Sequence, residues 1–146
     1  MNETAVQSIS DLQTVARDFV DRHPEGAAVG LSGDLGSGKT TFVRCCVEAV
    51  AKLSKVACPR VTSPSFVLHQ RYELIRPVEH FDLYRLEGLG SSALAELGYF
   101  DALERVRAGR GFLFVEWPEK ATASLGLDFT VVFEIRGDKR VLQSRK

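Results

Sequence analysis

The sequence predicts an α/β domain, a three-layer sandwich whose central parallel strands are flanked by antiparallel strands. An apolar run of strand length precedes a glycine-rich turn, and an amphipathic helix follows that turn. Further strand and helix patterns then alternate along the chain. A length of 146 residues suits one hydrophobic core, so we assign residues 1–146 to a single domain.

The first helix is predicted from Ser10 to about Val20. Ser10 and Gln13 have the spacing of a capping box, in which each side chain bonds the backbone of the other residue. The segment His23–Gly26 contains proline and glycine and ends the helix. Residues 27–31 are apolar, which indicates a short strand buried on both faces.

A second helix is predicted from Lys39 to about Leu53, directly after the glycine-rich turn at 33–38. Apolar side chains recur along it at the spacing of one buried stripe. The stripe consists of Phe42, Cys46, Ala49, Val50 and Leu53.

Two strands are predicted next, at Phe66–Glu73 and Glu79–Tyr84. A helix follows, capped by one serine of the Ser91–Ser92 pair and continuing through Leu103. Gly98 is expected to interrupt or bend this helix, because glycine costs about 1 kcal/mol relative to alanine in a helix interior.

The last two predicted strands are Phe112–Trp117, which Pro118 stops, and Phe129–Arg136, which turns at Gly137–Asp138. The first of them is the most apolar predicted strand after residues 27–31. The second alternates only weakly and is interpreted as a late strand.

Composition narrows the function classes. Lysine plus arginine and aspartate plus glutamate number nineteen each, so the chain lacks the basic excess typical of direct nucleic-acid binding. The polar start is unlike a signal peptide, and no apolar run approaches the roughly 20 residues of a membrane helix. Cys45, Cys46 and Cys58 are odd in number and lack C-x-x-C spacing. We therefore expect a cytoplasmic protein without a membrane segment, whose adjacent cysteines are buried as small apolar groups.

The glycine-rich turn matches the phosphate-binding pattern G-x-x-x-x-G-K-[ST] at every fixed position. Its residues are Gly33, Asp34, Leu35, Gly36, Ser37, Gly38, Lys39 and Thr40. Such a turn lets consecutive backbone N–H groups face an anion at the positive end of the following helix. Lys39 is expected to reach the β- and γ-phosphates of a nucleotide, and the Thr40 hydroxyl to bind Mg²⁺. The fold is thus predicted to be P-loop NTPase-like, with ATP or ADP and Mg²⁺ as cofactors.

A P-loop also needs a carboxylate near the phosphates, placed at the end of an apolar strand. Glu116 ends the run 112–116 and is the stronger candidate for magnesium. Asp82 follows His80 and Phe81; it could orient water, act as a base or pair with Arg85. We expect His80 to be a strand histidine satisfied by a hydrogen bond.

Together with the P-loop, three further motifs give the chain a resemblance to the TsaE (YjeE) family over about residues 10–140. These motifs are H-F-D-L-Y-R-L from His80, E-L-G from Glu96 and E-W-P-E from Glu116, and a Ser63–Phe66 loop accompanies them. The resemblance implies a weak ATPase required for the threonylcarbamoyladenosine modification of tRNA. It would act on the TsaD–TsaB pair and permit repeated turnover, while a TsaC-type enzyme makes the activated intermediate.

The resemblance also implies roles for individual residues. It assigns the phosphates to Gly36–Thr41, with Thr41 included, magnesium to Thr40 and Glu116, and catalysis to Lys39, Asp82 and the switch-loop hydroxyl of Ser65. It places Trp117 and Glu119 near the nucleotide and Asp11 or Thr14 near the adenine. Two positions depart from the family pattern: Ser65 replaces threonine, and Cys45 replaces glycine.

Two other functions fit a P-loop. A small-molecule kinase needs an acceptor pocket and usually an arginine-bearing lid, and so short a chain has no obvious lid insert. A nucleotide-dependent interaction module would bind ATP without hydrolysing it. ATP turnover with and without the partners separates the three.

Overall fold

The computed structural model describes residues 3–62, 64 and 67–146, and these form a sandwich around one seven-stranded sheet. Parallel pairing joins four neighbouring strands at the centre, and antiparallel pairing adds strands at both edges. The predicted fold class is therefore confirmed. In sheet order the strands are β1 (Glu3–Val6), β7 (Lys139–Arg145), β6 (Phe129–Arg136), β2 (Ala27–Ser32), β5 (Phe112–Glu116), β4 (Val78–Asp82) and β3 (His69–Tyr72).

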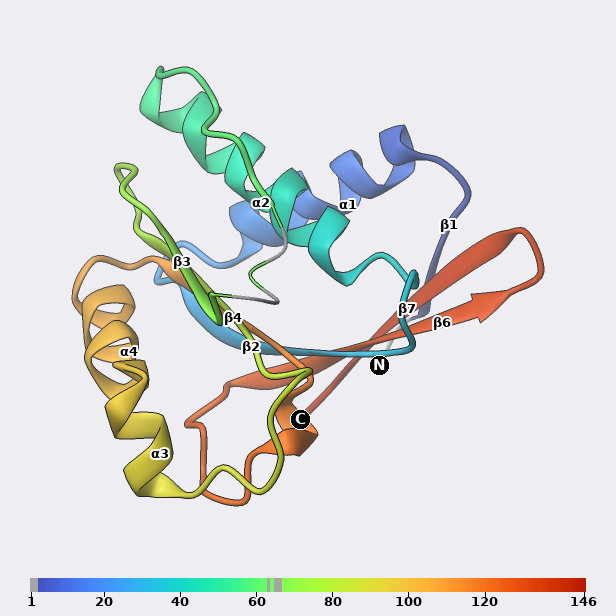
Figure 1. Ribbon diagram of the computed structural model, residues 1–146. Helices are drawn as coiled ribbons and strands as arrows, with labels where there is room; N and C mark the ends of the chain where they lie inside the picture. The colour runs from blue at the N-terminus through green and yellow to red at the C-terminus, as the bar shows by residue number, and fades with distance from the viewer. Residues whose placement is uncertain (1–2, 63, 65–66) are drawn as a thin grey trace.

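Helices cover both faces of the sheet (Figure 1). On one side lie α1 (Ile9–Arg22) and α2 (Lys39–Ser54), and on the other α3 (Ser91–Glu96) and α4 (Tyr99–Ala108). Successive residues of a strand face opposite sides, so the central strands supply both cores. Val29 and Phe114 pack under α1 and α2, whereas Ala28 and Val115 pack under α4.

The first helix begins earlier than predicted, because Ser8 and not Ser10 caps it. Ser8 Oγ accepts a hydrogen bond from the Asp11 N–H at 3.1 Å, and Asp11 Oδ2 accepts one from the Gln7 N–H at 2.9 Å. This exchange satisfies two backbone donors at the helix start. Ser10 lies inside the first turn of α1, so the predicted capping box is wrong.

The second helix is confirmed, and its predicted buried stripe is correct except at Leu53. Phe42, Cys46 and Val50 are buried and Ala49 is partly buried, but Leu53 is 53 % exposed. Leu53 lies in the last turn of α2, which extends beyond the sheet (Figure 1). The periodic pattern therefore continues past the point where the sheet is available for packing.

Several strand bounds differ from the predictions. β3 starts at His69, because Leu68 has a left-handed φ of 69° and its N–H bonds the Pro64 carbonyl in a turn. The predicted start at Phe66 lies outside the described residues. β4 ends at Asp82, so Tyr84 is not part of a strand.

The strand predicted at Phe112–Trp117 ends one residue early, since Trp117 has a φ of 61° and begins the short 3₁₀ helix η1 (Pro118–Lys120). The strand Phe129–Arg136 is confirmed. Gly98 separates two short helices, as expected. The edge strand β1 and its neighbour β7 were not predicted.

The cysteine expectation is confirmed for the adjacent pair. Cys45 and Cys46 lie on the buried face of α2, and Cys58 is exposed. All three thiols are free. Within the described part of the chain, no helix has the length and apolar character needed to span a bilayer.

Candidate functional site

The parallel strands bring the predicted site residues to one edge of the sheet. The P-loop leaves the carboxyl end of β2, while Glu116 ends β5 and Asp82 ends β4. In the strand register Glu116 pairs with Leu31 on one side and with Asp82 on the other. Ligands of open α/β sheets bind at this edge, outside the carboxyl ends of the strands.

The loop backbone follows a path that favours glycine. Gly33 has a φ of 147°, and a Cβ added there would lie 2.5 Å from the Phe133 carbonyl oxygen. Gly36 has a φ of 77° but open space around it. Gly33 is thus required by close packing against β6, and Gly36 by backbone conformation alone. The helix α2 then starts at Lys39, so its positive end faces the loop.

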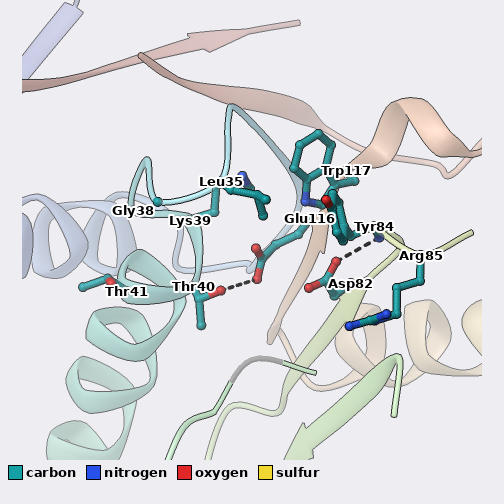
Figure 2. A pocket seen from close by; sticks show the side chains of 11 residues that line it. Leu35, Gly38, Lys39, Thr40, Thr41, Asp82, Tyr84, Arg85, Glu116 and Trp117 are labelled. Atoms are coloured by element: carbon teal, nitrogen blue, oxygen red, sulfur yellow. Dashed lines mark hydrogen bonds between the residues drawn. The ribbon is translucent and has the colours of Figure 1, made fainter. Parts of the chain in front are cut away.

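A cavity of about 290 Å³ lies between the P-loop and the ends of β4 and β5. Figure 2 shows side chains from the loop, from α2 and from both strands meeting around it. The lining residues are Leu35, Gly36, Gly38, Lys39, Thr40, Thr41, Asp82, Tyr84, Arg85, Glu116 and Trp117.

Lys39 is the buried cation of the site, with 4 % of its surface exposed. Its ammonium donates hydrogen bonds to the carbonyls of Gly33 and, at 3.0 Å, of Asp34. Nζ also lies 4.5 Å from the centre of the Trp117 ring, within the range of a cation–π contact. Burial lowers the pKa of Lys39 although nearby carboxylates, Glu116 foremost, oppose that change.

Thr40 and Glu116 form the central polar contact of the site. The Thr40 hydroxyl donates a 2.8 Å hydrogen bond to Oε2 of Glu116, which is 3 % exposed (Figure 2). A hydroxyl that gives its hydrogen to a carboxylate keeps lone pairs to offer a cation. The two side chains are therefore oriented as a pair of oxygen ligands at the start of α2.

Asp82 is buried at the end of β4 and lines the same cavity. Its Oδ1 accepts a hydrogen bond from the Tyr84 N–H at 3.0 Å, which fixes the carboxylate against the following turn (Figure 2). The arrangement places two carboxylates, Asp82 and Glu116, on neighbouring strands opposite the P-loop.

The other predicted site residues have different positions. Gly33, Asp34 and Ser37 belong to the loop but do not line the cavity. Asp11 and Thr14 are exposed on the first turns of α1, where the Asp11 carboxylate accepts a hydrogen bond from the Gln7 N–H and the Thr14 hydroxyl donates one to the Ser10 carbonyl. Glu119, in η1, accepts a hydrogen bond from the Ser32 hydroxyl at 3.2 Å and does not line the cavity either. Ser65 lies outside the described residues.

Comparison with known proteins identifies the family of the chain. The model of the family "Threonylcarbamoyl adenosine biosynthesis protein TsaE" matches residues 6–145. The chain belongs to the TsaE family. TsaE proteins take part in the biosynthesis of threonylcarbamoyladenosine in tRNA, and this role applies to the chain as a family member.

Individual relatives support the assignment to TsaE. The TsaE protein of Aquifex aeolicus is 34 % identical over 122 residues, which are 82 % of this chain and 79 % of that protein. The Borreliella burgdorferi TsaE is 31 % identical over 131 residues, 88 % of each chain. The crystal structure of Bacillus subtilis YdiB matches 99 % of this chain and 84 % of its own with a TM-score of 0.66; at 21 % identity it supports the fold alone.

Sequence reasoning did not assign two lining residues of this TsaE-family site. Tyr84 and Arg85 directly follow β4, and both border the cavity (Figure 2). The Tyr84 ring lies 5.0 Å from the Trp117 ring, so the two aromatic side chains form one wall. Their place two and three residues after Asp82, at a strand end, was the available signal.

Proposed function

We propose that the chain binds ATP with Mg²⁺ at the P-loop, hydrolyses ATP slowly and acts on the TsaD–TsaB pair in threonylcarbamoyladenosine synthesis. The observation that carries the proposal is the hydrogen bond between Thr40 and Glu116. It joins the first turn of the P-loop helix to the acid that ends the neighbouring strand, where a nucleotide-bound Mg²⁺ is usually held.

The residues present fit a triphosphate. The cavity is bounded by loop backbone at Gly36 and Gly38, by the positive end of α2 and by the Lys39 ammonium. Lys39 now bonds loop carbonyls, and a phosphate would offer it a stronger, charged acceptor. Leu35, which is 63 % exposed, stands at the rim of the same cavity.

The residues also fit Mg²⁺. Within the described ranges, no three side chains of the His, Cys, Asp and Glu types gather as a metal site on their own. Mg²⁺ commonly takes one or two protein oxygens and completes its shell with phosphates and water. Thr40 and Glu116 would supply the protein oxygens. The bound ion would neutralise charge that develops on the transferred phosphoryl group.

Hydrolysis further requires a group that positions or deprotonates water. Asp82 is the candidate, since its carboxylate lines the cavity beside Glu116 and is held by the Tyr84 N–H. Lys39 would hold the phosphate oxygens. The resemblance also assigns a role to the Ser65 hydroxyl, and a switch loop completed by the partner would account for slow turnover in isolation.

The family supports the choice of partners. TsaE proteins serve tRNA modification, yet this chain has equal numbers of acidic and basic residues. A role on the protein pair TsaD–TsaB, with a TsaC-type enzyme upstream in the cytoplasm, needs no direct contact with tRNA.

The test is ATP turnover of the purified chain alone and with TsaD and TsaB. We expect slow, Mg²⁺-dependent phosphate release and nucleotide-dependent association with the pair. Rapid phosphorylation of a small acceptor would instead favour a kinase. Tight ATP binding with phosphate release at background, even with both partners present, would show an interaction module without catalysis.

A further inference from the structure

We propose that His80 is a positioning residue that orients the Glu116 carboxylate for Mg²⁺. The inference rests on the function proposed above, because it assigns a task within the same site. It goes beyond the sequence expectation, which treated His80 as a strand histidine satisfied by any hydrogen bond.

The strand register brings the two side chains together. His80 on β4 pairs with Phe114 on β5, so Glu116 is two residues further along on the same side of the sheet. His80 Nε2 lies 2.6 Å from Oε2 of Glu116. His80 has no exposed surface and Glu116 has 3 %, so water does not compete for the contact.

The direction of the hydrogen bond follows from the partner. An ionised carboxylate only accepts hydrogen bonds, so Nε2 of His80 carries the hydrogen and donates it. The same oxygen accepts the Thr40 hydroxyl at 2.8 Å. Two donors on Oε2 fix the rotation of the carboxylate, and no hydrogen bond from a described residue reaches Oε1. Oε1 therefore keeps its lone pairs for a cation.

The second ring nitrogen, Nδ1, forms no hydrogen bond with a described residue, so the contact of Nε2 with Glu116 is the hydrogen bond that His80 contributes. Nδ1 is nevertheless buried. An unpaired buried polar atom is unfavourable, and an apolar side chain of similar size would avoid it. A histidine at this position is therefore explained by what Nε2 does for Glu116. Groups that orient a metal ligand in this way commonly control metal affinity.

The test compares three variants with the unchanged chain. His80→Leu removes the donor, and His80→Gln keeps an N–H group on a side chain of similar reach. Val78→Ala is the matched control, because Val78 is buried on the same strand and the same side of the sheet but packs in the apolar core. Two quantities are measured: the free Mg²⁺ concentration that gives half-maximal ATP hydrolysis, and the affinity for ADP in EDTA.

For His80→Leu we expect the required Mg²⁺ concentration to rise by about tenfold or more, the range seen when an outer partner of a metal ligand is lost. ADP affinity in EDTA should stay within about twofold, and His80→Gln should recover part of the Mg²⁺ response. Val78→Ala should lower thermal stability without changing the Mg²⁺ requirement.

An unchanged Mg²⁺ requirement in His80→Leu, or an equal shift in Val78→Ala, would overturn the inference. If His80→Leu does not fold, His80→Asn, whose shorter amide cannot reach Glu116 equally well, provides the same comparison. Absence of any Mg²⁺-dependent hydrolysis in the unchanged chain would refute the proposed function, and the inference with it. If the unchanged chain hydrolyses ATP in a Mg²⁺-dependent way and the His80 variants need the same Mg²⁺ concentration, only the inference about His80 is refuted.

Discussion

The hydroxyl of Thr40 donates a 2.8 Å hydrogen bond to Oε2 of Glu116, across 76 positions of the sequence. This bond connects the first turn of α2 with the end of β5. The P-loop is thereby tied to the central strand whose acid we propose as a magnesium ligand. The parallel pairing of β2, β5 and β4 brings the P-loop, Glu116 and Asp82 to the same edge of the sheet.

Thr40→Val replaces the hydroxyl by a methyl group of similar volume. We expect Mg²⁺-dependent ATP hydrolysis to fall by about tenfold or more, because a hydrogen bond to a charged group contributes about 1.5–3 kcal/mol. Thr40→Ser keeps the hydroxyl and should retain most activity. The measurement is phosphate release at varied Mg²⁺; equal rates for Thr40→Val and the unchanged chain would contradict the role of the hydroxyl.

Lys39→Ala removes the buried ammonium of the site. ATP affinity should fall by about ten- to a hundredfold, as expected for the loss of a charge-assisted hydrogen bond. Lys52→Ala serves as the control, because Lys52 is exposed near the other end of α2. Calorimetric titration with ATP measures both variants, and a similar affinity in the two would argue against the proposed phosphate cradle.

Ser8→Ala should destabilise the chain by about 1 kcal/mol, the usual cost of losing an N-cap side chain. Ser10→Ala should change the free energy of unfolding by less than about 0.5 kcal/mol, since Ser10 is exposed and makes no capping bond through its side chain. Urea denaturation of both variants gives the comparison. A larger loss for Ser10→Ala would restore the capping box that the sequence pattern indicated.

Glu79, next to His80 on β4, is fully buried and contacts Arg105 and His69 on the α4 side of the sheet. Arg105 Nε lies 3.0 Å from its Oε2, and His69 Nε2 lies 2.5 Å from its Oε1. Burial acts to raise the pKa of Glu79, but the hydrogen bonds from His69 and Arg105 outweigh it and lower the pKa below 4.5. The folded state therefore holds this proton less tightly than the unfolded state.

Because the pKa of Glu79 is lower in the folded state, protonation of Glu79 destabilises the fold. The stabilisation from Glu79 is complete above pH 4.5 and is lost as the pH falls through the lower pKa of the folded state. Glu79→Gln should cost about 1.5–3 kcal/mol at pH 7. Its free energy of unfolding should fall less steeply between about pH 5 and pH 3 than that of the unchanged chain.

The control for this pH prediction is Glu73→Gln, because Glu73 is largely exposed in its pair with Arg71. It should change the free energy of unfolding by less than about 0.5 kcal/mol at pH 7. Denaturation curves at several pH values measure all three proteins. Parallel pH profiles for Glu79→Gln and the unchanged chain would show that Glu79 does not carry the acid dependence.

Local signals predicted much of the fold and the centre of the site. The P-loop motif identifies Lys39 and Thr40 from a short stretch of consecutive residues. An apolar strand that ends in one acid identifies Glu116. These features are encoded by neighbours in the sequence. The parallel centre of the sheet follows from the same alternation of strand and helix.

Features set by tertiary contacts were missed or misplaced. The edge strand β1 is short and its neighbour β7 is rich in charged residues, so their apolar patterns are weak. Leu53 continues a helical pattern that the sheet does not cover. The contact of His80 with Glu116 depends on the register of β4 and β5, which no local pattern specifies.

Binding of ATP and Mg²⁺ at the P-loop is tested most directly by a crystal structure of the chain grown with a non-hydrolysable ATP analogue and Mg²⁺. We expect the β- and γ-phosphates to lie against the loop backbone and Lys39, with one metal ion held beside Thr40 and Glu116. A nucleotide bound elsewhere on the chain, with neither side chain near the metal, would contradict it.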